Sequence, residues 1–292
     1  MKSIEFISHS RLKMTAGPGQ KSSEVWSDIA DGFLKAANNS EVETRISGPM
    51  SYHDNEEYIN LVAAAINRKP DAIVLPFSPS GKAREKFTNV LEGYDGNIVA
   101  VNVPPSPEQK KILGKRLLGY TGMNEFAAGE TAARELIFRK WENKIMHILV
   151  LVHEKNHSGL ELRVEGVKHG VKNYGFNPDV RAVYVDPKKQ KVAIPKRWLM
   201  KDENFGVITL GIRGTEAALI SSPIKPFGIV SIDLDNDVKQ AILNNSIACT
   251  LIQHPREEGM IAMKIALNPG NEFAELFCGP TIVDKNNVHV FA

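Results

Sequence analysis

The sequence predicts an α/β fold made of two similar lobes, each with a parallel sheet between layers of helices. Short apolar runs rich in β-branched residues alternate with longer segments whose apolar residues recur at helical spacing. Most of the short runs are apolar throughout, as expected for parallel strands that are covered on both faces. This alternation runs once before about residue 122 and again after it, which indicates two doubly wound lobes.

The expected strands and helices follow one another along the chain. The strands are expected at residues 4–8, 43–47, 71–77, 97–103, 144–152, 180–185, 205–210, 227–232 and 247–252. Between them lie apolar stripes with i, i+3, i+4 spacing. These stripes comprise Trp26, Ile29, Ala30, Phe33, Leu34 and Ala37; Tyr58, Ile59, Val62, Ala65 and Ile66; and Leu160, Val164, Val167 and Val171.

Composition excludes several classes of protein. The 36 Lys and Arg against 34 Asp and Glu leave a net charge of +2, which gives no electrostatic reason to bind nucleic acid or an acidic membrane. No apolar run approaches the roughly 20 residues of a transmembrane helix. The N-terminal residues lack the apolar core of a secretory signal, so the chain is expected to be cytoplasmic unless a leader has been removed. Cys249 and Cys278 are expected to be two buried thiols, although a single bridge is the alternative.

Residues 153–157 spell H-E-x-x-H, the pattern of a zinc protease. That chemistry requires a helix, which places residues i and i+4 on one face. Here the motif follows an expected buried strand, and Ser158 and Glu161 match a capping box that would start a helix after the second histidine. His153 and His157 are therefore expected on a loop at the carboxyl end of a strand, where open α/β sheets bind ligands, and no metal is expected there.

Four segments together resemble type I periplasmic binding proteins of the ribose-binding class. The first is LGYTGMNEFAAGETAAREL (118–136), in which Asn124 stands as a helix N-cap and small residues allow close packing. The others are NHSGLELRVEGVKHGVKNYG, PDAIVLPFSPSG and GIVSIDLDNDVKQAILNNSIACTLIQHPREEGMIAMKIAL. Their order and spacing cover nearly the whole chain. They are specific for the superfamily but not for the ligand.

The resemblance implies two Rossmann-like lobes that are joined by three hinge crossings and close on a small ligand. The crossings are expected near residues 121–124, 253–255 and 278–280. They divide the chain into an N-terminal lobe of residues 1–121 plus 254–278 and a C-terminal lobe of residues 122–253 plus 279–292. Lactose-repressor-type regulators share this body but carry a helix-turn-helix ahead of it, and the first expected strand here already starts at Ile4.

The resemblance also implies a set of ligand-binding residues, each with a structural alternative. Trp26 would cover an apolar sugar face or begin the core stripe of its helix. Asp233 would bind hydroxyl groups or cap a helix that begins near Leu234. Gln253 would bind the ligand or make a plain hinge hydrogen bond. The full expected set is Trp26, Asn102, Asn156, His157, Glu161, Asp233 and Gln253.

The chain departs from the ribose binders at several of these positions. Asn102-Val103 replaces Asp-Arg, Glu161 replaces a ligand-binding Arg that stands two residues before the structural Arg163, and Gly211-Ile212 replaces Asn-Asp. Glu161 has the capping box as its alternative role. Asn156 and His157 resemble the loop of simple-sugar and polyol binders, with a solvated loop as the alternative. His9, Arg11 and Lys13 lie in a long loop before Trp26, and the sequence assigns them no individual role.

The expected function is capture of a sugar, a polyol or an autoinducer-like furanosyl compound for an ABC importer or a chemoreceptor. The protein would then be a monomer located in the periplasm or at the cell surface. The alternative is a cytoplasmic ligand-sensing domain of a regulator. The sequence contains no G-x-S-x-G, G-x-x-x-x-G-K-[ST] or G-x-G-x-x-G motif, so no enzyme activity and no cofactor are expected.

Overall fold

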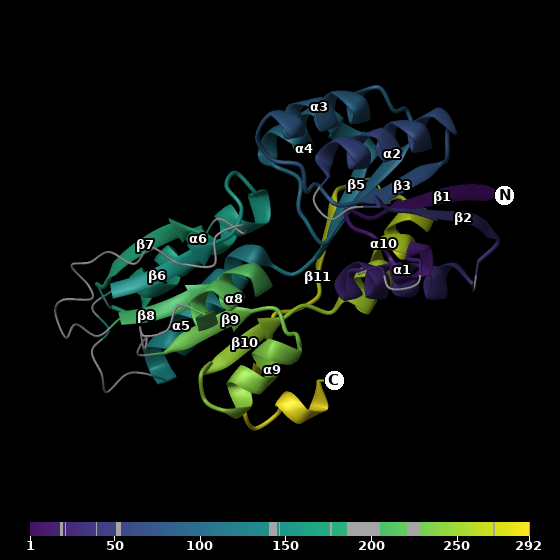
Figure 1. Cartoon of the computed structure of the whole chain (residues 1–292). Coiled ribbons are helices and arrows are strands. Elements are labelled where there is room, and N and C mark those ends of the chain that lie inside the picture. The colour runs from purple at the N-terminus through teal and green to yellow at the C-terminus, as the bar shows by residue number, and fades with distance from the viewer. Residues whose placement is uncertain are drawn as a thin grey trace. The chain divides into compact units, whose positions relative to one another are not determined.

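The computed structural model describes residues 1–17, 20, 22–38, 40–50, 54–139, 145, 147–175, 177–185, 205–220, 228–270 and 272–291. The chain folds into two compact units. Unit 1 comprises Met1–Met123 and His254–Cys278, and unit 2 comprises Asn124–Gln253 and Gly279–Ala292. Each unit is an α/β layer structure with its own sheet, which confirms the predicted fold class (Figure 1). In the described part of the chain, no helix is long and apolar enough to cross a membrane.

Unit 1 contains a six-stranded sheet in which every pair of neighbouring strands is parallel. The strand order is β11-β5-β4-β3-β1-β2. The strands are β1 (Lys2–Ile7), β2 (Val42–Ser47), β3 (Ala72–Leu75), β4 (Asn97–Val101), β5 (Leu117–Gly122) and β11 (Ala274–Phe277). The helices are α1 (Glu24–Ala37), α2 (Asn55–Asn67), α3 (Gly81–Glu92), α4 (Pro107–Leu113) and α10 (Pro255–Leu267), with 3₁₀ turns η1 (Lys13–Thr15) and η2 (Gly114–Arg116).

The two faces of this sheet are covered by different helices (Figure 1). The helices α1 and α10 pack on one face, where Phe6, Phe33 and Met263 belong to one buried cluster. The other face carries α2 and α3, and Tyr58 and Phe87 stack there with their ring centroids 5.7 Å apart. Burial on both faces explains why the strands of this unit read as continuous apolar runs.

Unit 2 repeats the plan with strand order β12-β10-β9-β8-β6-β7. Its strands are β6 (His147–Val152), β7 (Asp179–Tyr184), β8 (Phe205–Thr209), β9 (Ile229–Ile232), β10 (Cys249–Ile252) and β12 (Thr281–Asp284), and only the β10–β12 pair is antiparallel among those described. Its helices are α5 (Glu125–Arg139), α6 (Ser158–Asn173), α8 (Ile212–Ile220) and α9 (Asn236–Leu243), with a 3₁₀ turn η4 (Val288–Val290). Figure 1 shows α5 on one side of this sheet and α9 on the other.

Helix pairs in both units meet at glycines. In unit 1, a Cβ on Gly32 would overlap the carbonyl oxygen of Arg256, and one on Gly259 would overlap that of Ile29. In unit 2, Gly129 lies in the same way against the carbonyl of Arg163. Backbones approach this closely only where no side chain intervenes. The close packing expected from the small residues of α5 is therefore confirmed.

Several expected boundaries were wrong. The nine expected strands did not include β5, β11 or β12, and β10 begins at Cys249 rather than at residue 247. The helix expected to begin near Leu234 begins at Asn236, with Asp235 as its N-cap. Residues 144, 146 and 227, at the start of two expected strands, lie outside the described residues, as do residues 18, 19 and 21 of the loop before Trp26.

Candidate functional site

Unit 2 gathers polar residues at the carboxyl ends of its strands. The strand order places β6 between β7 and β8, so successive strands are added on one side of β6 at β7 and on its other side from β8 onward, although all three strands are parallel. A crevice forms at such a switch point in open α/β sheets, and ligands bind there. His153 follows β6 and Gly211 follows β8, one on each side of this switch point. Asp233 follows β9, the next strand along.

Asp233 is held in a left-handed conformation, with φ of 73°. Its backbone N–H donates to Leu251 O at 2.8 Å, and its carbonyl accepts from Thr250 Oγ1 at 2.7 Å. These two bonds to β10 hold a conformation that is unusual for a residue with a side chain. The side chain of Asp233 accepts at Oδ1 from Gln253 Nε2 at 2.9 Å. Two predicted site residues are thus brought together.

Asp233 does not cap α9. The cap is Asp235, whose Oδ1 accepts from Val238 N at 2.8 Å. The alternative role considered for Asp233 is therefore wrong. Its Oδ2 accepts no hydrogen bond from any described residue, and the residue keeps partial exposure to solvent. Burial raises the pKa of Asp233, while Arg163 and the bond from Gln253 lower it in part. The carboxylate is available for a ligand.

A buried ion pair supports the loop that follows β8. Arg163 of α6 and Glu125 of α5 are both buried, and Arg163 Nε lies 2.5 Å from Glu125 Oε2. Arg163 Nη1 also donates to Leu210 O at 2.8 Å, just before Gly211. Burial raises the pKa of Glu125, and the charge of Arg163 opposes that rise. Arg163 is thus a structural residue, as the resemblance implied.

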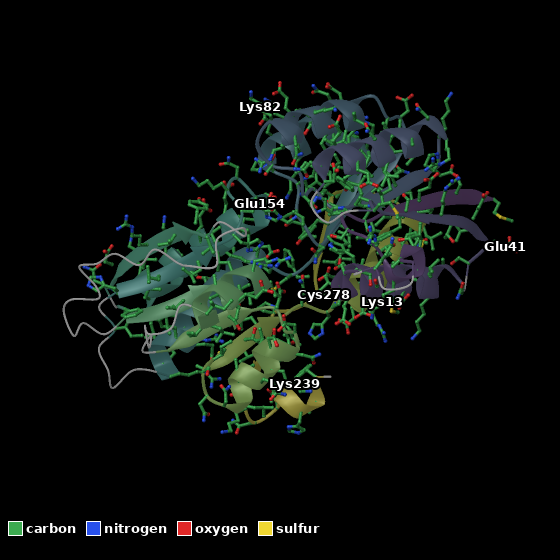
Figure 2. All side chains as sticks on the ribbon, in the orientation of Figure 1. Lys13, Glu41, Lys82, Glu154, Lys239 and Cys278 are labelled. Atoms are coloured by element: carbon green, nitrogen blue, oxygen red, sulfur yellow. The ribbon has the colours of Figure 1, made fainter. Side chains whose placement is uncertain are left out.

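The loop from 153 to 157 joins β6 to α6, and Figure 2 labels Glu154 within it. The helix begins after the second histidine, as expected, so His153 and His157 do not share a helical face. The predicted capping box is wrong, because His157 is the N-cap and its Nδ1 accepts from Leu160 N at 3.4 Å. Asn156 is exposed with φ of 59°, and Glu161 is an exposed residue in the first turn.

His153 differs from its neighbours in this loop. Its Nδ1 is buried and has no hydrogen-bond partner among the described residues. Burial, together with the charges of Arg163 and Arg213, lowers the pKa of His153 to about 4. The imidazole is therefore neutral at physiological pH.

Unit 1 carries a second polar group at the carboxyl ends of β1 and β3. His9 is buried, lies 3.4 Å from Asn55 Oδ1 and packs edge-on against Tyr58. Burial lowers the pKa of His9 to about 4, against the effect of the Asn55 hydrogen bond. Within the described ranges, Ser10 Oγ and Arg11 Nε are buried without a hydrogen-bond partner.

Two other residues predicted in unit 1, Asn102 and Trp26, make contacts within that unit. Asn102 has φ of 63°, and its Nδ2 donates to Glu258 Oε2 at 3.1 Å. Trp26 is 7% exposed and belongs to the cluster beneath α1 and α10. Its alternative role as a core residue is thus supported, and its contact with a ligand stays a prediction. Lys13 is exposed, with its Nζ 3.7 Å from Glu24.

The remaining candidate side chains are the two cysteines and the residues able to bind a metal ion. Cys249 and Cys278 are free and buried, as expected, and burial raises their pKa values to about 12 and about 11. Among the described residues, no three His, Cys, Asp or Glu side chains are grouped so as to hold a metal ion. Two surface depressions, one beside Asp54 and one beside Arg139, contain none of the predicted site residues.

The family of the chain follows from its sequence. Residues 17–269 match the model of the periplasmic binding protein domain. The chain belongs to that family. Comparison with curated proteins found no significant match.

Several solved structures share the fold. A carbohydrate transporter from Acidothermus cellulolyticus 11B, in complex with myo-inositol, is 24% identical, with a TM-score of 0.71 over 99% of this chain and 96% of that one. An ABC transporter solute-binding protein from Agrobacterium vitis, bound with α-D-tagatopyranose, is 16% identical, with a TM-score of 0.77 over 99% and 96%. A putative LacI transcriptional regulator from Bacteroides fragilis is 14% identical, with a TM-score of 0.72 over 100% and 99%.

Proposed function

We propose that the chain is a solute-binding protein for a neutral polyhydroxylated ligand of the sugar or polyol class. The observation that carries this proposal is Asp233. Its carboxylate is held by Gln253 at one oxygen, leaves the other without a hydrogen bond from the described residues, and does not cap α9. Carboxylates accept charge-assisted hydrogen bonds from hydroxyl groups, which are roughly twice as strong as neutral ones.

Each unit contains some of the proposed ligand-binding residues. Unit 2 offers Asp233 and Gln253 with the loop residues Asn156, His157 and Glu161. Unit 1 offers Asn102 and Trp26. Support comes from membership of the family and from the similarly folded proteins whose structures contain myo-inositol and tagatopyranose. The protein would bind the ligand without converting it and deliver it to an ABC permease or a chemoreceptor. It would act as a monomer in the periplasm or at the cell surface.

A regulatory role is the second candidate, because a putative LacI regulator has the same fold over its whole length. In that case the chain would sense the same ligand in the cytoplasm. Fractionation of the native host separates the two: the transport role requires the protein outside the cytoplasmic membrane, and the sensor role requires it inside.

The ligand class is tested with a thermal-shift screen of pentoses, hexoses and polyols that includes myo-inositol, D-arabinose and D-tagatose. A ligand present at 100 times its dissociation constant stabilises the folded state by about 2.7 kcal/mol, which such a screen detects. Stabilisation by at least one of these compounds is expected. If none of them shifts the melting temperature, the ligand belongs to another class and the proposal is wrong.

Asp233→Ala tests the site, with Asp235→Ala as a matched control. Loss of Asp233 should weaken binding at least about tenfold, equivalent to ~1.4 kcal/mol, because a ligand hydroxyl loses its acceptor. Loss of Asp235 removes the cap of α9, so it should lower stability by about 1 kcal/mol and leave affinity unchanged. Titration calorimetry beside denaturant unfolding measures both. Unchanged affinity in Asp233→Ala would remove this residue from the site.

A further inference from the structure

His153 is a polar residue that neither the fold nor the predicted ligand set uses. It follows β6 directly at the switch point of the unit 2 sheet. It makes no described hydrogen bond through Nδ1, and the ring as a whole keeps partial exposure. Buried nitrogen atoms without partners are rare and call for an explanation, because they lose their bonds to water. The orientation of this ring therefore has a physical cause other than a hydrogen bond within the protein.

The burial of Nδ1 determines where the imidazole proton resides. A neutral imidazole carries its proton on one nitrogen and a lone pair on the other. A buried N–H without an acceptor is costlier than a buried lone pair, since orphaned N–H groups are the rarer of the two in native structures. The proton thus resides on Nε2, and Nε2 is a donor on the exposed side of the ring.

Gly211 brings the ring close to Asp233. A Cβ placed on Gly211 would lie 2.9 Å from His153 Cε1 and 3.6 Å from Asp233 Oδ2. His153 Nδ1 lies 3.5 Å from the same point, so the Cε1–Nδ1 edge of the imidazole and the carboxylate lie around it and leave no room there for a side chain on residue 211. The backbone of Gly211, with φ of 152°, is one that other residues rarely adopt. One small ligand with neighbouring hydroxyl groups can reach both side chains.

We propose that His153 is a specificity-determining residue of the ligand site, where its Nε2–H donates to a ligand hydroxyl oxygen while Asp233 Oδ2 accepts from a hydroxyl hydrogen. This inference rests on the proposed function and deepens it. A hydroxyl group both donates and accepts, so a neighbouring donor and acceptor select polyols over ligands that can only donate, such as ammonium groups. Arg163 and Arg213 nearby also disfavour a cationic ligand, whereas Asp233 disfavours a carboxylate beside it.

The tautomer is tested first, without any ligand. In protein labelled with ¹⁵N in its histidines, the His153 ring should give the pattern of a neutral imidazole protonated at Nε2 between pH 5.5 and pH 8. Assignment uses the signal lost in His153→Leu. A proton on Nδ1, or an imidazolium at pH 7, would overturn the inference and leave the proposed function intact.

Binding is tested with three variants and the sugar from the thermal-shift panel that binds best. His153→Leu should weaken binding at least about tenfold, because the ligand loses its donor. His153→Gln places an amide near the position of Nε2 and should restore most of the affinity. His153→Asn places its amide near Nδ1 and should not. His289→Leu, at an exposed position in η4, is the matched control and should bind as the wild type does.

The outcomes separate the two claims. If the wild type binds a sugar and His153→Leu binds it within about twofold, the inference is wrong and the function stands. If Asn rescues binding and Gln does not, Nδ1 rather than Nε2 faces the ligand, which also overturns it. If no compound of the panel binds, the proposed function fails and the inference falls with it. Loss of stability in His153→Leu without loss of affinity would assign the ring a purely structural role.

Discussion

The two units share a backbone plan but differ in charge. In each, one helix crosses another at glycines. The carbonyl that meets Gly259 belongs to Ile29, three residues before Gly32 of α1, and the carbonyl that meets Gly129 belongs to Arg163, three residues before Gly166 of α6. These two residues therefore occupy matching positions. Ile29 is fully buried in an apolar cluster, whereas Arg163 is buried against Glu125. One scaffold thus tolerates either an aliphatic side chain or an ion pair at the same crossing.

The match extends to the strand ends. Asn102 follows β4 and Asp233 follows β9, both with left-handed backbones. The N–H of each donates to the neighbouring strand, Asn102 to Thr121 O and Asp233 to Leu251 O. In unit 1 the side chain is an amide bonded to Glu258, and in unit 2 it is a carboxylate with one oxygen atom that accepts no hydrogen bond from the described residues. The backbone thus fixes where the polar groups lie, and the side chains determine what each unit can bind.

The largest effect is expected from breaking the ion pair. Arg163→Leu should lower the free energy of unfolding by about 3–5 kcal/mol, because it leaves Glu125 buried without its cation. The double variant Glu125→Leu/Arg163→Leu should recover most of the loss, since Ile29 shows that an apolar residue fits this crossing. Denaturant unfolding measures both. A double variant as unstable as the single one would mean that the bond from Arg163 to Leu210 O, and not the charge pair, is what matters.

The glycine crossings should respond alike in the two units. Gly259→Ala and Gly129→Ala should each cost about 1–3 kcal/mol or more, because the new methyl group overlaps a carbonyl oxygen of the partner helix. Hydrogen exchange should place the loss in α1 and α10 for the first and in α5 and α6 for the second. Gly93→Ala is the control. Its φ is −77° and its nearest neighbour is 3.7 Å away, so a change within about 0.5 kcal/mol is expected.

Each unit has one buried histidine whose titration should affect stability. The folded-state pKa values of His9 and His153 are lowered from 6.5 to about 4. Between those values the unfolded chain binds more protons, so stability falls as the pH falls through this window. Each histidine should contribute on the order of 1–3 kcal/mol to that loss.

The raised pKa values of Glu125 and Asp233 make the folded state more stable as the pH falls, which offsets the effect of the histidines. The contribution of each histidine is therefore obtained by comparing its variant with the wild type. His9→Phe and His153→Leu should each reduce the difference in unfolding free energy between pH 7 and pH 4.5. The double variant should reduce it most. An unchanged difference in either single variant would show that the pKa of the histidine in that unit is not lowered in the folded state.

The smallest effect concerns the left-handed residue of unit 1. Asn102→Ala should be less stable than Asn102→Gly by about 1 kcal/mol, because both lose the bond to Glu258 and only alanine bears the steric cost of a positive φ. Thermal unfolding of the two variants gives the difference. Equal stabilities would indicate that the backbone relaxes out of this conformation once the side chain is removed.

The sequence predicted most of the fold because buried parallel strands leave a strong apolar signal. It missed β11, whose residues from Glu275 to Phe277 are exposed, because an edge strand need not be apolar. It expected α9 to begin near Leu234, two residues early, with capping as the alternative role of Asp233, since Asp233 and Asp235 are both suitable N-caps and only the backbone distinguishes them. The roles of Glu125 and His153 could not be predicted. Burial of a carboxylate or an imidazole depends on packing from segments distant in the sequence.

The order in which the chain returns to unit 1 has a consequence for synthesis on the ribosome. Helix α1 ends at Ala37, but its packing partner α10 begins at Pro255 and the last strand of the sheet ends at Phe277. Unit 2 likewise needs β12, beyond residue 280, to complete its sheet. At a synthesis rate of about 5–20 residues per second, α10 is completed on the order of ten seconds or more after α1. During that time the apolar face of α1 has no packing partner. A nascent chain of this kind is a natural client for chaperones that bind exposed apolar surface.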